Sequence, residues 1–328
     1  MSSSQSPATV NLSELLENSR VGPLQIRVFV LCMACLIMDG SAVQAMGYAA
    51  PAVPADWGVP GSTLGPVFAA ANFGVLLGAL FFSMLADKIG RRPVLVWCTF
   101  FFSVMTIGTA FAQNIEQLLW LRFIGGIGMG CIIPNATALV GEFSPKAKRV
   151  TLMMCITVGF TGGAALGGFI AAWLIPLFGW QSVFIFGGAV PLVIAFVMLW
   201  GLPESLQFLA VRQAGREQLT KWLKQLAPTL AIDSSTRFAA NESAKAGVAL
   251  VHLFREGRAA FTVLLWVVNF MNILMLYTLS NWLPTLVAGM GYDTQTAVFV
   301  GTTLQVGGTI GTLGVAWLIA KRGFPAML

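Results

Sequence analysis

The sequence predicts an all-α integral membrane protein, and two observations support this prediction. Hydrophobic residues make up 57% of the 328 residues, whereas charged residues make up only 10%. An ordinary soluble domain carries about 25% charged residues. The apolar residues are also gathered in long blocks, which is typical of helices that cross a bilayer. Together these features exclude a water-soluble enzyme, a disordered chain and a nucleic-acid-binding protein.

Eight apolar blocks are long enough to cross a membrane, because a spanning helix needs about 20 mostly apolar residues. Their approximate limits are 25–50, 64–86, 93–112, 117–141, 150–174, 181–202, 259–288 and 296–319. The chain therefore divides into a tail (1–24), a six-span bundle (25–202), a loop (203–258) and a partial second bundle of two spans (259–328). We also expect Pro134 to kink the fourth span, because proline lacks a backbone N–H.

Basic residues lie almost entirely on one side of the predicted spans. The connectors of that side and the N-terminal tail hold 18 of the 19 Lys and Arg residues, and the short connectors of the other side hold none. Cytoplasmic segments of membrane proteins are enriched in Lys and Arg. We therefore expect a multi-pass protein of the plasma (inner) membrane with a cytoplasmic N-terminus. The net charge of +6 reports this topology and does not indicate a nucleic-acid partner.

No catalytic or metal-binding constellation is visible in the sequence. Cys32 and Cys35 have the spacing of a redox motif, but they lie on an apolar block, where packing is the better interpretation. The single histidine, His252, has no companion ligands for a metal. We therefore expect no enzyme activity, no metal and no cofactor.

The two last spans repeat the beginning of the chain. A shift of 233 residues superimposes Pro51 on Pro284, Gly74 on Gly307 and Gly78 on Gly311 without a gap. Two parallel halves joined by a long loop are a known layout of transporters. The repeat ends after two spans, so the second half lacks about four spans relative to a full copy. This leaves open a separate chain that supplies them.

Asp39 and Arg122 are the two charged residues that lie clearly inside predicted spans. Each costs about 2.5–3.5 kcal/mol at mid-membrane on insertion scales. Asp39 lies about 21 Å into the first span and Arg122 about 9 Å into the oppositely directed fourth span, so their depths are similar. Arg122 would bind the anionic end of a substrate, and Asp39 would carry the coupled proton. The alternative is a static ion pair that fixes helix packing.

The seventh span carries amide and aromatic side chains. Tyr277 and Asn281 are four residues apart and share one helix face. Asn272 falls on Asp39 under the repeat, so we expect it on the wall of a central cavity. Such groups suit a planar, partly polar acid, and we predict that Asn272, Tyr277 and Asn281 bind it. Interhelical hydrogen bonding is an equally open interpretation.

The run LADKIGRR at 85–92, between the second and third spans, resembles the loop signature of the major facilitator superfamily. Gly90 permits a tight turn, and Asp87 can then receive a helix N-terminus or a basic residue. This arrangement would form a latch that holds one conformation. The alternative is a solvated turn whose charges anchor the inner surface.

Glu142 is a second acid at the inner surface, four residues from Lys146 and close to Arg149. We predict that Glu142 and Lys146, with Arg149 nearby, are gate charges of the inner surface. Gly90 and Arg91 of the loop at 85–92 are also assigned to the conformational change. Ordinary surface pairing is equally open.

Within the superfamily, the chain is most similar to the aromatic acid:proton symporters. The segments that carry this resemblance are 39–48 with Pro51, 122–123, 134–137, 142–145, 202–205, 271–272 and 281–284. The resemblance implies proton-coupled uptake of small aromatic carboxylates by alternating access. The chain departs from the family pattern at Ala42 and Ala320, where acids are usual. The alternatives are a transporter of another organic acid or a sugar, and a truncated membrane remnant that does not transport.

Overall fold

The computed structural model describes residues 9–11, 21–212, 220, 222–223, 237–239, 254 and 257–322. In this part of the chain, eight helical segments are long and apolar enough to cross a membrane. Each overlaps one of the eight predicted blocks, although the limits differ. The predicted all-α membrane fold is confirmed. The exception among the described residues is a short parallel pair of strands, β1 (Thr9–Asn11) and β2 (Arg237–Ala239). Most of the predicted tail and loop lies outside the described residues.

The helices follow one another in the predicted order. The first four spans are formed by α2 (Pro23–Ala49), α4 (Gly65–Ile89) with α3 (Ala52–Trp57) and η1 (Gly61–Leu64) before it, α5 (Arg91–Thr109), and α6 (Ile115–Met129) with α7 (Ile132–Phe143). The others are formed by α8 (Lys146–Phe178), α9 (Gln181–Gly201) followed by α10 (Leu206–Arg212), α13 (Ala259–Gly289) and α14 (Thr294–Arg322).

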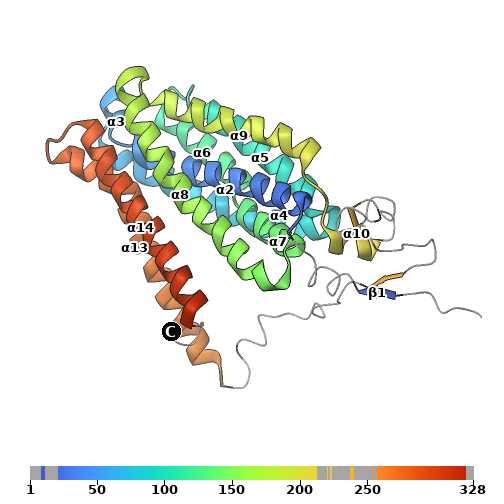
Figure 1. Cartoon of the computed structure of the whole chain (residues 1–328). Helices are drawn as coiled ribbons and strands as arrows, with labels where there is room; N and C mark the ends of the chain where they lie inside the picture. The colour runs from blue at the N-terminus through green and yellow to red at the C-terminus, as the bar shows by residue number, and fades with distance from the viewer. Residues whose placement is uncertain are drawn as a thin grey trace, which may run out of the picture.

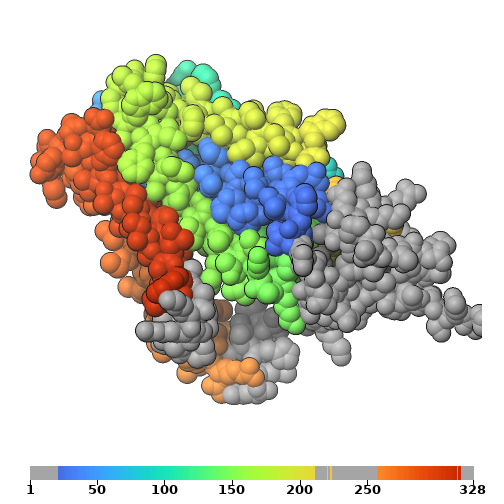
Figure 2. Space-filling view, viewed as in Figure 1, coloured from blue at the N-terminus to red at the C-terminus, as the bar shows by residue number. Residues whose placement is uncertain are grey.

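The helix α2 is central to the six-helix bundle, where it packs against α8, α9 and α7. The helix α4 packs on α6, and α5 packs on α9 and α6. The last two helices form a pair beside this bundle, with α14 against α8 and α13 against α2 (Figure 1). The space-filling view shows the same pair lying along α8 (Figure 2). The helices α2, α8, α13 and α14 therefore form the junction between the two parts.

The surface of the bundle carries many large apolar side chains. Trp97, Phe111, Trp173 and Trp200 are each more than half exposed. Such a surface is costly in water but is expected where lipid is the solvent. The outward-facing residues therefore agree with the predicted lipid bilayer.

The fourth span is broken into α6 and α7 around Gly130 and Cys131. Pro134 lies four residues after Gly130 and has no N–H to donate to the Gly130 carbonyl, so the regular hydrogen-bond ladder cannot continue there. The predicted kink at Pro134 is confirmed, and the interruption lies about one turn before the proline, as expected for a missing bond between residues four apart.

Candidate functional site

A cavity of about 800 Å³ lies where α2, α8, α13 and α14 meet. Its volume falls in the range of about 300–1,000 Å³ that small-molecule sites occupy. The described residues that line it include Gly40, Val43 and Gln44 of α2, Phe160, Thr161 and Ala164 of α8, Leu276, Tyr277, Ser280 and Leu283 of α13, and Val300, Thr303, Leu304, Gln305, Gly307, Gly308 and Thr312 of α14. None of these residues is charged. The cavity is thus suited to a small, mostly apolar molecule with a few polar groups.

Ser280 ties three of these helices together. Pro284 lies four residues after it in α13 and cannot donate to the Ser280 carbonyl. The side chain of Gln44 takes this place, and its Nε2 donates to that carbonyl oxygen at 2.6 Å. The Nε2 of Gln305 donates to the Ser280 hydroxyl at 3.3 Å. Gln44, Ser280 and Gln305 were not among the residues predicted to form the site, although a proline inside a span signals a free carbonyl four residues earlier.

The helices close together on the side of the cavity that lies toward the C-terminal end of α2. A Cβ atom at Gly47 would lie 3.1 Å from the carbonyl oxygen of Ser280 and 3.4 Å from the Cα of Asn281, so only a small residue fits this crossing. Nearby, the rings of Phe68 and Trp282 meet edge to face with centroids 5.5 Å apart. These contacts join α13 to α2 and α4.

The three predicted binding residues of the seventh span have different positions. Tyr277 lines the cavity, and its predicted role in binding stays a prediction. Asn281 is buried next to the helix crossing at Gly47 and does not line the cavity. Asn272 is exposed and also does not line it. The position of each residue along and around α13 therefore decides whether its side chain can reach a ligand in the cavity. In the present conformation only Tyr277 of these three residues can do so.

Asp39 lies next to the cavity-lining Gly40 and is only 1% exposed. Its Oδ1 atom is buried and has no hydrogen-bond partner among the described residues. It is close enough to Tyr277 for an electrostatic interaction. Asp39 itself does not line the cavity. Buried polar atoms normally have a partner, so an unpartnered carboxyl oxygen inside a predicted span is a candidate proton-handling group.

Arg122 contacts the helix α2 about one turn from Asp39, but it does not pair with Asp39. Its Nη2 donates to the carbonyl oxygen of Ala42 at 3.2 Å, and its Cζ lies 5.7 Å from the centre of the Phe184 ring. Ala42 is three residues from Asp39, which is about 4.5 Å along the helix. The only ion pair found among the described residues joins Arg91 to Glu142.

The expected cavity shared by Asp39 and Arg122 is not formed. Arg122 is 5% exposed and does not line the cavity. Ala42, which it contacts, is two residues from the cavity-lining Gln44, and residues two apart point away from each other on a helix. The helix α2 therefore lies between the Arg122 guanidinium and the cavity.

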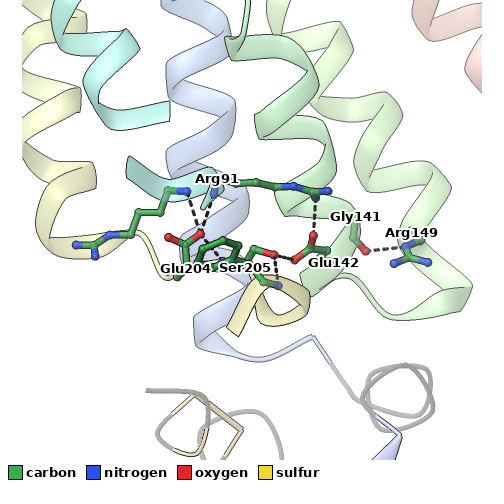
Figure 3. Close-up of polar contacts among 8 residues, drawn as sticks. Arg91, Gly141, Glu142, Arg149, Glu204 and Ser205 are labelled. Carbon is green, nitrogen blue, oxygen red and sulfur yellow. Dashed lines mark hydrogen bonds and ion pairs between the residues drawn. The ribbon is translucent and has the colours of Figure 1, made fainter. Parts of the chain in front are cut away.

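A second polar cluster lies at the end of the bundle where α5 begins (Figure 3). Arg91 forms its ion pair with Glu142 of α7, and the hydroxyl of Ser205 donates to the other carboxylate oxygen of Glu142 at 2.6 Å. The Nε of Arg149 donates to the Gly141 carbonyl at 2.6 Å. The predicted gate residues Arg91, Glu142 and Arg149 are thus brought to one place.

Glu204 caps the N-terminus of α5. Its Oε1 accepts hydrogen bonds from the backbone N–H groups of Arg91 at 2.9 Å and Arg92 at 3.1 Å. Gly90 has a φ of 105°, and a Cβ there would lie 2.5 Å from the Glu204 carboxylate, so glycine is required for both reasons. The predicted acceptor of a helix N-terminus was Asp87. That residue is exposed and has no hydrogen bond or ion pair to the described residues, and its latch role stays a prediction.

Replacement of Glu204 by Ala is expected to lower the free energy of unfolding by about 1–2 kcal/mol, because two N–H groups at a helix start lose a charged acceptor. Thermal unfolding in detergent micelles measures this change. Glu116→Ala is the matched control, since Glu116 is an exposed acid in the first turn of α6. Equal small shifts in both variants would contradict the capping role.

The chain matches known transporters in sequence and in structure. The family described as Major Facilitator Superfamily matches residues 30–328. The "4-hydroxybenzoate transporter PcaK" of Pseudomonas aeruginosa is 38% identical over 98% of this chain and 72% of its own length. The "Gallate transporter" of Pseudomonas putida is 36% identical over 96% of this chain and 70% of its own length. The xylose transporter XylE from E. coli, solved in a partially occluded inward open conformation, superposes with a TM-score of 0.71 at 16% identity, over 91% of this chain and 74% of that one.

Proposed function

We propose that the chain, which belongs to the major facilitator superfamily, is a secondary transporter that carries small aromatic carboxylates together with protons. The observation that carries the proposal is the uncharged cavity between the six-helix bundle and the α13–α14 pair. Relatives named as transporters of 4-hydroxybenzoate and gallate support the substrate class. Binding at the interface of two helical parts suits alternating access, in which one part rocks against the other around the site.

The cavity walls suit an aromatic ring. Apolar side chains such as Phe160, Leu276 and Leu283 provide most of the surface, and Tyr277 adds an aromatic face with a hydroxyl group. Aromatic pairs gain about 0.5–1.5 kcal/mol beyond the burial of their area. We therefore propose that Tyr277 packs against the substrate ring.

Asp39 is the proposed proton carrier, because its Oδ1 is buried without a partner among the described residues, Asp39 directly precedes the cavity-lining Gly40, and it interacts electrostatically with Tyr277. Arg122 is the proposed partner of the substrate carboxylate. This role requires a conformation in which α2 shifts and the Arg122 contact with the Ala42 carbonyl is exchanged for the anion. Asn272 and Asn281 are proposed to reach the ligand only in such another conformation.

The charges around Arg91 are proposed to control the change between conformations. Arg91 joins α5 to Glu142 of α7, and Arg149 joins α8 to the same helix through the Gly141 carbonyl. Asp87 and Gly90 complete the proposed latch. We place this end of the bundle and the N-terminus in the cytoplasm and the chain in the plasma membrane, following the distribution of basic residues.

Purified chain in proteoliposomes is expected to take up labelled 4-hydroxybenzoate in a saturable manner when the outside is made acidic. A protonophore should abolish accumulation, unlabelled benzoate should compete, and xylose should not. Protein-free vesicles provide the control for passive entry of the neutral acid. The proposal would be refuted if uptake did not saturate, or if it did not respond to the pH gradient.

A further inference from the structure

We propose that Gln44 and Gln305 determine specificity by accepting a hydrogen bond from a ring hydroxyl group of the substrate. The site would then prefer hydroxylated aromatic acids to acids whose ring carries no hydroxyl. This inference rests on the proposed function and names the substrate class within it.

The orientation of the Gln44 amide is fixed by the helix beside it. Pro284 leaves the Ser280 carbonyl without its helical donor, and a carbonyl oxygen can only accept. The amide nitrogen of Gln44 must therefore face it, as the 2.6 Å contact shows. The amide oxygen then points elsewhere, and it has no hydrogen bond to a described residue. Because Gln44 lines the cavity, this oxygen is an acceptor available to a ligand.

Gln305 provides a second acceptor from the opposite helix. Its amide nitrogen is engaged with the Ser280 hydroxyl, and its oxygen also lacks a hydrogen bond among the described residues. Both glutamines line the cavity and both approach Ser280. The amide oxygens of Gln44 on α2 and of Gln305 on α14 are thus two free acceptors that lie on either side of Ser280.

The threonine hydroxyl groups of the wall are already engaged as donors. Thr161 donates to the Val158 carbonyl, and Thr303 donates to the Phe299 carbonyl, each within its own helix. Thr312 does the same toward Gly308. An ionised carboxylate has only acceptor atoms, so two amide oxygens cannot bind it. A phenolic O–H is a donor, and it is the complementary group for this part of the cavity.

The test compares KM values for benzoate and for whichever of the 2-, 3- and 4-hydroxybenzoates binds best. Wild-type protein is expected to prefer the hydroxylated acid by about tenfold, in keeping with one hydrogen bond that the apolar ring cannot replace. Gln44→Leu and Gln305→Leu should each reduce this preference toward unity. Thr161→Val is the matched control in the same cavity, and it should change both KM values by the same factor.

The KM ratio does not depend on the amount of folded protein in the vesicles, so partial misfolding does not mask the result. If Gln44→Leu does not fold because the Ser280 carbonyl loses its donor, Gln305→Leu decides, since that contact involves only side chains. Equal KM values in wild type, or an unchanged preference in the variants that fold, would overturn the inference and leave the proposed function intact. Absence of saturable uptake of all these acids would overturn both.

Discussion

Replacement of Asp39 by Asn is expected to abolish accumulation of substrate against its gradient while exchange of labelled for unlabelled acid continues. Asparagine has nearly the same shape as aspartic acid but cannot take up and release a proton. Asp39 is 1% exposed, and its Oδ1 lacks a partner among the described residues, so few contacts should be lost. With one proton per substrate, a gradient of two pH units supports about 100-fold accumulation, because each unit is worth about 1.36 kcal/mol. The variant should reach a ratio of about one.

Two measurements separate coupling from binding in this variant. Accumulation is measured under an imposed pH gradient, and exchange is measured with equal pH on both sides. Glu116→Gln, an exposed carboxylate at the start of α6, is the control for simple loss of an acid. If the Asp39 variant accumulates substrate as wild type does, Asp39 is not the proton carrier.

Undiminished proton-driven uptake by Arg122→Gln would likewise remove the role proposed for Arg122.

The bilayer made the fold predictable from local sequence. A segment must be apolar over about 20 residues to cross the membrane, so block length alone pointed to the eight long apolar helices among the described residues. The kink at Pro134 was predictable for the same local reason, because one missing N–H breaks one bond of the helix ladder. The resemblance to the major facilitator superfamily, seen in the segment 85–92 and others, is confirmed by the match over residues 30–328.

The site was only partly predictable, because sequence gives depth along a helix but not the neighbour that each face meets. Arg122 and Asp39 do lie within about one turn of each other, yet Arg122 contacts the face of α2 that carries Ala42. The cavity lies beyond Gln44 on another face of α2. Which face points to α13 and which to α9 depends on how all the helices pack together. Tyr277 does line the cavity, and its role in substrate binding stays a prediction.

The contact between Glu204 and the start of α5 could not be predicted from the sequence for a different reason. Glu204 and the backbone of Arg91 are 113 residues apart and belong to different spans. No periodic pattern connects them, and the acid closer in sequence, Asp87, was the natural choice for the helix start. Only the packing of α9 beside α5 brings Glu204 to this position.

Replacement of Arg91 by Ala is expected to destabilise the protein strongly, because the partner carboxylate is buried. The Glu142 side chain is 4% exposed, whereas that of Arg91 is 24% exposed. Removing one member of a fully buried pair costs about 3–5 kcal/mol, since the other charge is left uncompensated. The partial exposure of Arg91 and the remaining hydrogen bond from Ser205 reduce our expectation to about 2–3 kcal/mol.

A double-mutant cycle identifies the pair as the cause of this loss. Arg91→Ala, Glu142→Ala and the double variant are compared by reversible unfolding in mixed micelles. The double variant should be more stable than the sum of the single changes predicts, by at least about 1 kcal/mol, because it leaves no buried charge unpaired. Arg92→Ala combined with Glu142→Ala is the matched control, since the Arg92 side chain donates to the Leu199 carbonyl and not to Glu142. Additive losses in both cycles would show that Arg91 does not stabilise the junction of α5 and α7 through Glu142, and the proposed latch would lose its only ion pair among the described residues.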